Sequence, residues 1–92
     1  MYILNKDRTN LVEAANVYVK EETEKRREEG FFSVGYVDVT WYRIYAEGRK
    51  RPEDEKMEVF LMGSYKSKQE AAKEMERIAD ALSSGAPVYK IS

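Results

Sequence analysis

The clearest periodic pattern in the chain is a helical one near its carboxyl end. Ser67-Lys68-Gln69-Glu70 has the spacing of a capping box, in which a serine caps the first turn and the glutamate bonds back to it. Gly85 suits a left-handed helix end and Pro87 cannot continue a helix, so a helix is expected from about Lys68 to Ser84. Apolar residues at spacings of three and four predict one buried stripe on it: Ala71, Met75, Ile78, Ala79 and Leu82.

The rest of the chain has the composition of strands and turns. The turn-forming stretch KDRTN follows the apolar residues 1–5, which predicts a hairpin whose second strand lies within residues 11–20, towards Val17-Tyr18-Val19. Residues 21–30, EETEKRREEG, contain no apolar side chain and are expected to form an exposed loop. Residues 88–91 leave room for a short final strand.

The densest run of aromatic and β-branched residues is Phe31–Ala46, which predicts a strand. Neither alternating set of its residues is cleanly apolar, so we expect a bulge near Gly35 or burial of both faces. Residues 57–62 restore strand character. The stretch between them, GRKRPEDE, is then the connection of a long antiparallel hairpin, with Gly48 permitting the turn.

These elements predict an α+β fold. A chain of 92 residues supports one core, so we expect a single domain over residues 1–92. The order of elements favours an antiparallel sheet of about four or five strands, packed on one face by the carboxyl-terminal amphipathic helix.

Composition narrows the possible chemistry. The chain has no histidine and no cysteine, which removes the commonest acid–base, nucleophilic and metal-binding side chains, so we expect neither an enzyme nor a cofactor. Asp38 and Glu58 could share a strand face, but alternation alone places polar residues there. No apolar run approaches the roughly 20 residues that span a bilayer, and the first residues lack the features of a secretory signal, so we expect a cytoplasmic protein without a membrane partner.

Two groups of residues are candidates for binding. Strand alternation places Arg43 on one face with the aromatic rings of Trp41 and Tyr45, an arrangement that suits a nucleotide or a protein hot spot. Arginines in the GRKRP stretch could hold a phosphate or an acidic surface; alternatively, its charges only keep a hairpin end soluble and the aromatic rings fill the core or a dimer contact. The candidate ligand-binding residues are Trp41, Tyr42, Arg43, Tyr45, Arg49, Lys50 and Arg51.

Three stretches, MYILNKDRT, LMGSYKSKQEAA and VYKI, resemble a group of small, uncharacterised accessory proteins of Gram-positive bacteria and their phages. In this group a short hairpin precedes further strands, an L-G-x-Y-x-[ST] junction and one helix. Residues 42–57 look longer than the group's usual hairpin. The resemblance implies an accessory protein of a mobile element, a setting in which regulators and inhibitors of host defence are common, and it implies no catalytic residue.

Two hypotheses about function remain. The first is a binding protein that inhibits host defence, either by sequestering a small anionic, nucleotide-like signal or by occupying a host protein. The second is a small nucleic-acid-binding regulator, which a net charge of −1 disfavours because duplex contact needs several phosphate partners. The surplus of large aromatics over what one helix can cover also predicts a homodimer or a higher homo-oligomer.

Overall fold

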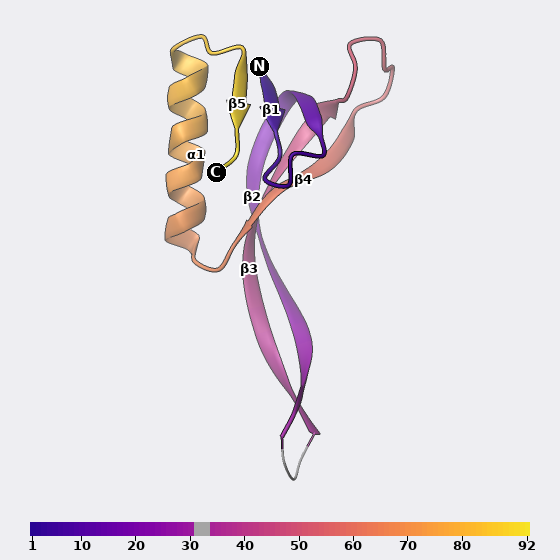
Figure 1. The fold of residues 1–92 in the computed structure, drawn as a ribbon, viewed down its shortest axis with the longest axis vertical. Helices are drawn as coiled ribbons and strands as arrows, with labels where there is room; N and C mark the ends of the chain where they lie inside the picture. The colour runs from indigo at the N-terminus through magenta and orange to yellow at the C-terminus, as the bar shows by residue number, and fades with distance from the viewer. Residues whose placement is uncertain (31–33) are drawn as a thin grey trace.

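A computed structural model describes residues 1–30 and 34–92, which form a curled sheet with one helix beside it (Figure 1). Neighbouring strands are antiparallel except β1 and β5, which pair in parallel, so the sheet is mixed. The predicted α+β fold with one carboxyl-terminal helix is confirmed. The elements are β1 (Tyr2–Leu4), β2 (Leu11–Glu29), β3 (Val34–Arg49), β4 (Glu58–Tyr65), α1 (Lys68–Ser83) and β5 (Val88–Lys90), and the strand order is β4-β3-β2-β1-β5.

Local signals set both ends of α1. The Ser67 hydroxyl accepts the Glu70 N–H at 3.1 Å, as the capping box predicts. At the other end Gly85 has a φ of 75°, and the Ala86 N–H donates to the Ala81 carbonyl at 3.0 Å. This six-to-one bond around a left-handed glycine is a Schellman motif, and it satisfies a carbonyl that the end of the helix would otherwise leave unpaired.

The core lies between α1 and the inner face of the curled sheet. Of the predicted stripe, Ala71 and Ile78 are buried, whereas Leu82, in the last turn of the helix, is 63% exposed. A carboxylate, Glu74, is buried in the same stripe. The buried hydrophobic residues are Ile3, Val12, Ile44, Ala46, Phe60, Met62, Tyr65, Ala71, Ile78 and Ile91.

The predicted amino-terminal hairpin is present, and its loop contacts β4 at the other edge of the sheet. The buried Asn5 side chain organises the turn, because its Oδ1 accepts the backbone N–H groups of Thr9 at 2.8 Å and Asn10 at 2.9 Å. The Lys6 N–H donates to the Met62 carbonyl at 2.8 Å, which fixes the loop against β4. The second strand begins at Leu11, earlier than the Val17 region where it was expected.

The largest departure from expectation is a long two-stranded ribbon that projects from the body (Figure 1). Residues 21–29, expected as a loop, belong to β2 and pair with β3 as far as Val34. On its other side β3 pairs with β4 only from Tyr42 to Gly48. Residues 22–29 and 34–41 therefore form a ribbon with one partner strand each, which we call the arm. Phe31, Phe32 and Ser33 of the expected strand lie outside the described residues.

The arm explains why neither face of the aromatic run is apolar, since no element within the described residues packs on either face of it. Polar cross-strand pairs hold it instead, as such pairs do in exposed sheets. The hydroxyls of Thr23 and Thr40 lie 3.1 Å apart, and Lys25 lies directly opposite Asp38. A strand made almost wholly of charged residues is stable here because β3 supplies the strand propensity.

The predicted irregularity at Gly35 is wrong. Gly35 lies in regular register opposite Glu28, and the register shifts occur instead between Ala14 and Asn16 and across from the Ile44–Tyr45 step. Gly48 also has a different role from the one expected, because it lies within β3 and not in the turn. A Cβ there would lie 2.0 Å from the Glu13 carbonyl oxygen, so glycine is required by the close approach of β2.

Candidate binding surface at the base of the arm

Alternation along β3 places three of the candidate residues on one face of the sheet. Ile44 and Ala46 point into the core, so Trp41, Arg43 and Tyr45 point to the opposite face, as predicted. No described helix covers that face (Figure 1). We call the residues gathered there the outer cluster: Tyr18, Glu22, Arg26, Trp41, Arg43, Tyr45 and Lys66.

Trp41 is the centre of the outer cluster. Three cations lie over its ring, at 6.0 Å for Arg26, 5.7 Å for Arg43 and 5.8 Å for Lys66, measured to the ring centroid. They come from β2, β3 and the junction between β4 and α1, so only the folded chain brings them together. Within the described part of the chain the buried Trp41 Nε1 has no hydrogen-bond acceptor. A partly exposed tryptophan with adjacent cations has the composition of an interface anchor.

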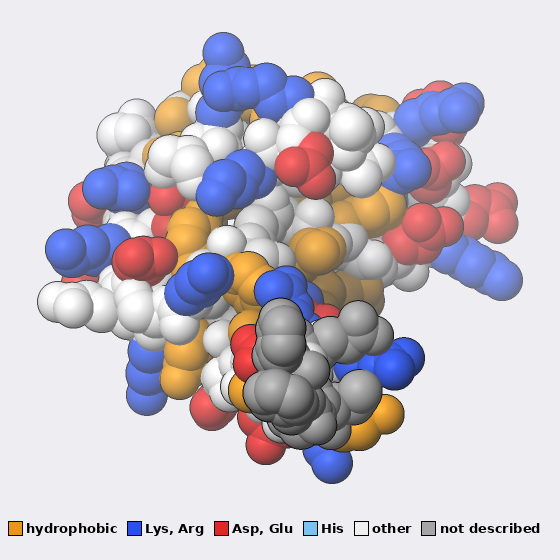
Figure 2. Space-filling view, turned by 60° about the horizontal axis from the view of Figure 1, so that its bottom comes forward, with side chains coloured by type: hydrophobic (Ala, Val, Ile, Leu, Met, Phe, Trp, Pro, Cys, Tyr) orange, Lys and Arg blue, Asp and Glu red, His pale blue; other side chains and the backbone are white. Residues whose placement is uncertain are grey.

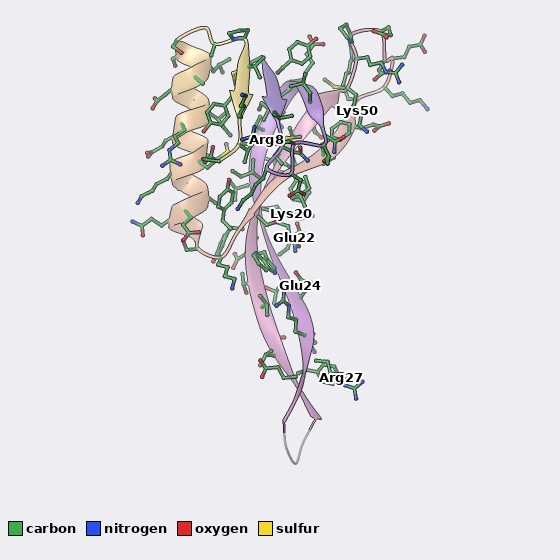
Figure 3. The ribbon with its side chains drawn as sticks, viewed as in Figure 1. Arg8, Lys20, Glu22, Glu24, Arg27 and Lys50 are labelled. Carbon is green, nitrogen blue, oxygen red and sulfur yellow. The ribbon has the colours of Figure 1, made fainter. Side chains whose placement is uncertain are left out.

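Carboxylates from β2 neutralise Arg43. Its Nη2 lies 2.7 Å from the Glu24 carboxylate and its Nη1 lies 3.8 Å from that of Glu22. Its Nε donates to the Ser64 hydroxyl at 3.3 Å. Figure 3 shows Glu22 and Glu24 along the upper part of the arm, next to the body. Because these groups already hold the guanidinium, Arg43 is poorly placed to bind a phosphate.

A tyrosine pair extends the outer cluster toward the body. The rings of Tyr18 and Tyr45 stack with their centroids 5.8 Å apart and an interplanar angle of 25°. The Tyr45 hydroxyl donates to Glu22, and this hydrogen bond, together with burial and the nearby negative charge, raises the pKa of Tyr45. The two stacked rings thus form an apolar surface, and Glu22 satisfies the Tyr45 hydroxyl within the chain.

A hollow of about 340 Å³ lies beside Trp41. Its walls come from the β1–β2 loop, through Lys6 and Asp7, and from β4, through Leu61 and Ser64. Leu61 is 45% exposed, so an apolar group of a partner could enter beside the tryptophan. The outer cluster therefore combines a ring, an apolar hollow and charges of both signs, as protein-binding surfaces do.

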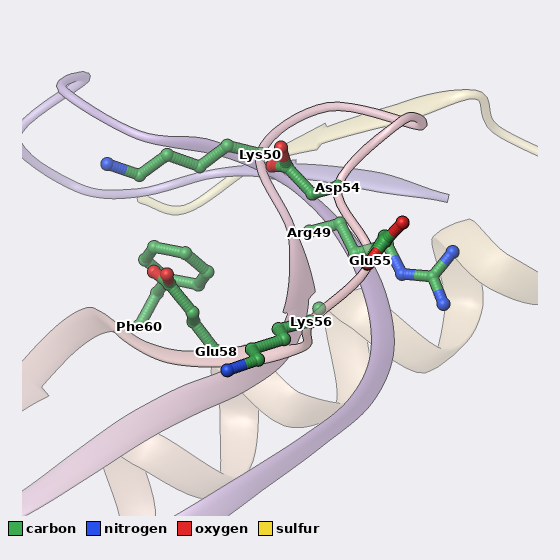
Figure 4. Close-up of a pocket in the computed structure, with 8 residues that line it drawn as sticks. Arg49, Lys50, Asp54, Glu55, Lys56, Glu58 and Phe60 are labelled. Carbon is green, nitrogen blue, oxygen red and sulfur yellow. The ribbon is translucent and has the colours of Figure 1, made fainter.

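The GRKRPEDE loop has a hollow of its own, of about 450 Å³, shown in Figure 4. Arg49, the last residue of β3, and Lys50, the first residue after it, extend in opposite directions there. The Lys50 Nζ lies 5.4 Å from the centre of the Phe60 ring, and the exposed Arg51 donates its N–H to the Asp54 carboxylate at 3.2 Å. The hollow is lined by three cations, Arg49, Lys50 and Lys56, and by three carboxylates, Asp54, Glu55 and Glu58. Equal numbers of opposite charges do not make an anion site.

The structure therefore divides the predicted site residues between two places. Arg49 lies six positions after Arg43 along β3, a distance of about 20 Å at the usual rise of about 3.3 Å per residue. Tyr42 lies on the helix-side face, where it packs against the core and its hydroxyl lies 3.4 Å from Glu21. One small ligand cannot contact both the outer cluster and the loop.

Sequence reasoning missed the residues that reach Trp41 from other elements. Arg26 fell in a segment expected as a loop, and Lys66 arrives only through the register of β4 against β3. Tyr18 was assigned to a strand, but its stacking on Tyr45 depends on the bulge between Ala14 and Asn16. The signal that could have found them is the pairing of β2 with β3.

Comparisons with known proteins do not identify the chain, because no family model, curated protein or solved structure matches it. Among residues 1–30 and 34–92 no group of carboxylates is placed to hold a metal ion. Nor does that part of the chain contain a helix long and apolar enough to cross a membrane. Viewed from the end of the arm, blue and red side chains are interspersed with hydrophobic ones (Figure 2).

Proposed function

We propose that this chain is a non-enzymatic binding protein that occupies a partner protein with its outer cluster. One observation carries the proposal: the Trp41 ring, flanked by Arg26, Arg43 and Lys66, lies on a sheet face without a covering layer. Tryptophan, tyrosine and arginine dominate the energetics of protein interfaces because they bury large areas and still offer polar or cationic contacts.

A partner protein fits this surface better than a small anion does. Arg43 is already held by Glu24 and Glu22, and the cations of the GRKRPEDE loop diverge. A protein can span the roughly 20 Å between the two places, whereas a nucleotide cannot. With the resemblance to phage and prophage accessory proteins, this supports a cytoplasmic inhibitor that acts by occupying a host protein.

Capture of an anionic nucleotide is the second candidate function. A base could stack on Trp41 while Arg26 and Lys66 meet its phosphate, since base stacking on aromatic rings needs no sequence-specific contact. Regulation through long nucleic acids has less support. In residues 22–29 and 34–41 the cations are outnumbered by carboxylates, and duplex binding depends on an excess of phosphate-binding cations.

The experiment compares Trp41→Ala with Leu82→Ala as a control, because Leu82 is an exposed apolar residue on α1, which packs on the opposite face of the sheet. Each tagged variant is expressed in a Gram-positive host. Proteins recovered with the parent and the control, but not with Trp41→Ala, are purified and titrated by calorimetry. A hot-spot tryptophan contributes about 2 kcal/mol or more, so Trp41→Ala should weaken binding at least about 30-fold.

Lys66→Glu adds a second test that avoids the partly buried ring, since Lys66 is exposed. Thermal unfolding of each variant separates loss of binding from loss of fold. Equal affinity of the parent and both site variants for every recovered protein would overturn the proposal. A nucleotide found by native mass spectrometry on the parent and absent from Trp41→Ala would favour the second candidate instead.

A further inference from the structure

The outer edge of β2 is open along most of its length. β1 pairs with β2 only from Leu11 to Glu13, and the Ala14 N–H bonds to the Met1 carbonyl. Beyond Asn16 no described strand lies on that edge, although β2 continues to Glu29 (Figure 1). An unpaired strand edge carries a row of free backbone donors and acceptors, which makes it a template for another strand.

The charges along this edge are arranged about Glu24 so that residues at equal distances on its two sides mostly carry opposite charges. Counted outward from Glu24, residues at equal distances form three oppositely charged combinations and one in which only Lys25 is charged. These are Lys20 with Glu28, Glu21 with Arg27, Glu22 with Arg26, and Thr23 with Lys25. An edge with this property is complementary to a second copy of itself.

We propose that two copies of the chain pair antiparallel along the β2 edge, about a twofold axis at Glu24. An axis perpendicular to the sheet keeps each side chain on its own face, so even-numbered residues must oppose even-numbered ones. The Glu24-centred register meets this condition and forms each of the three opposite-charge pairs twice. It joins the two arms into one sheet of order β3-β2-β2-β3.

Neighbouring registers are less favourable. An axis at Thr23 opposes Glu22 to Glu24 and Lys20 to Arg26, and an axis at Lys25 opposes Glu22 to Glu28. Directly opposed like charges destabilise a sheet. The one like-charge contact in the Glu24-centred register is Glu24 with itself, and Arg43 lies 2.7 Å from that carboxylate and offsets its charge.

Contacts within one chain explain why a second copy is the occupant. In its own hairpin Lys20 lies opposite Arg43, a like charge, and Glu28 lies opposite Gly35. Lys20 is marked at the base of the arm in Figure 3. Pairing with a second copy gives both residues an opposite charge directly across. It also adds strands to a two-stranded ribbon, an element that is marginal in water by itself. The β2 edge and the outer cluster share Glu22 and Arg26. The dimer rests on the backbone edge of β2, however, whereas the proposed function rests on the Trp41 ring, so the two can be tested separately.

Charge reversal at Lys20 and Glu28 tests the register. Lys20→Glu places two carboxylates opposite each other at two symmetry-related sites, and Glu28→Lys places two ammonium groups there. Each variant should weaken self-association by about tenfold or more. An equimolar mixture should restore it, because each site in the mixed dimer then pairs one carboxylate with one ammonium group. Light scattering after size exclusion and native mass spectrometry measure the masses against the 10.7 kDa chain.

Lys73→Glu is the control, because it makes the same change in net charge on the exposed side of α1 and should leave the parent's dimer intact. Trp41→Ala should also leave the dimer intact, which separates this inference from the proposed function. Circular dichroism confirms that each variant is folded. A parent that stays monomeric up to about 100 μM, where even weak dimers form, overturns the proposal. So does a pair of reversal variants that dimerise as the parent does, or a mixture that fails to form the mixed dimer.

Discussion

Glu74 is the buried group whose replacement has the most informative outcome. Its side chain is 1% exposed, in the middle of the helix face that packs on the sheet. The hydroxyls of Tyr89 and Ser92 donate to its carboxylate, and the Arg77 guanidinium lies 3.3 Å away. Burial raises the pKa of Glu74, but these hydrogen bonds lower it by more, so it lies below its ordinary value.

Glu74→Gln keeps the size of the side chain and removes its charge. Hydrogen bonds to a charged acceptor contribute about 1.5–3 kcal/mol, whereas neutral ones contribute about 0.5–1.5 kcal/mol. Two hydroxyls, of the half-buried Tyr89 and the exposed Ser92, donate to the buried carboxylate of Glu74, and Arg77 is 60% exposed and adds little. The expected loss at pH 7 is therefore about 2–3 kcal/mol, which lowers the Tm by roughly 10–20 °C for a chain of this size.

The dependence on pH identifies the charge as the cause. A carboxyl group whose pKa is lowered by folding stabilises the protein above its unfolded pKa, and this stabilisation is lost as the pH falls through the folded pKa. The gap between the parent and Glu74→Gln should thus be full at pH 7 and smaller at pH 3 in urea unfolding. Glu76→Gln, exposed on the same helix, should show little change at either pH. An equal gap at both pH values would mean that packing, and not charge, explains the loss.

Two further predictions use the strands and the tyrosines. Gly48→Ala should lower the free energy of unfolding by about 1–3 kcal/mol in urea titrations, because the new Cβ meets the Glu13 backbone. Gly35→Ala is the control and should not destabilise the chain, because open space surrounds Gly35. Equal effects of the two substitutions would contradict the close approach of β2 to Gly48. Burial raises the pKa of Tyr65 to about 12 and that of Tyr89 to about 12, so stability should be full below pH 10 and fall as the pH rises toward 12. Absorbance at 295 nm should show at least two tyrosines that ionise late, and ionisation of all the tyrosines near pH 10 in folded protein would refute this.

The helix was predictable because its signals are local. Ser67 caps the residue three positions away, and Gly85 ends the helix within two residues of its last turn. The buried Glu74 was not predictable, since its partners Tyr89 and Ser92 reach it only through β5 and the residues after it. A charge in an apolar stripe is recognisable as buried only when its hydrogen-bond donors are known.

The strands were predictable only where their own composition favoured them. Trp41 and Arg43 share a face because alternation within β3 requires it, and this needs no knowledge of the neighbours. Residues 21–29 consist almost wholly of charged residues, which do not favour a strand, and they form one only by pairing with β3. Lys66 was not predictable either, because it reaches Trp41 only through the register of β4 against β3, which residues distant in the sequence determine.

Because no described element packs on the faces of the arm, the local stability of the arm should be lower than that of the body. Amides in the ribbon can open by separating two strands, whereas those in the body open only when α1 leaves the sheet. Hydrogen exchange should therefore be faster in residues 22–29 and 35–41 than in α1. A molecule that clamps the ribbon would slow exchange there without changing the slowest amides of the body. Exchange rates along β2 and β3 would thus report occupancy of the arm directly, even before the occupant has been identified.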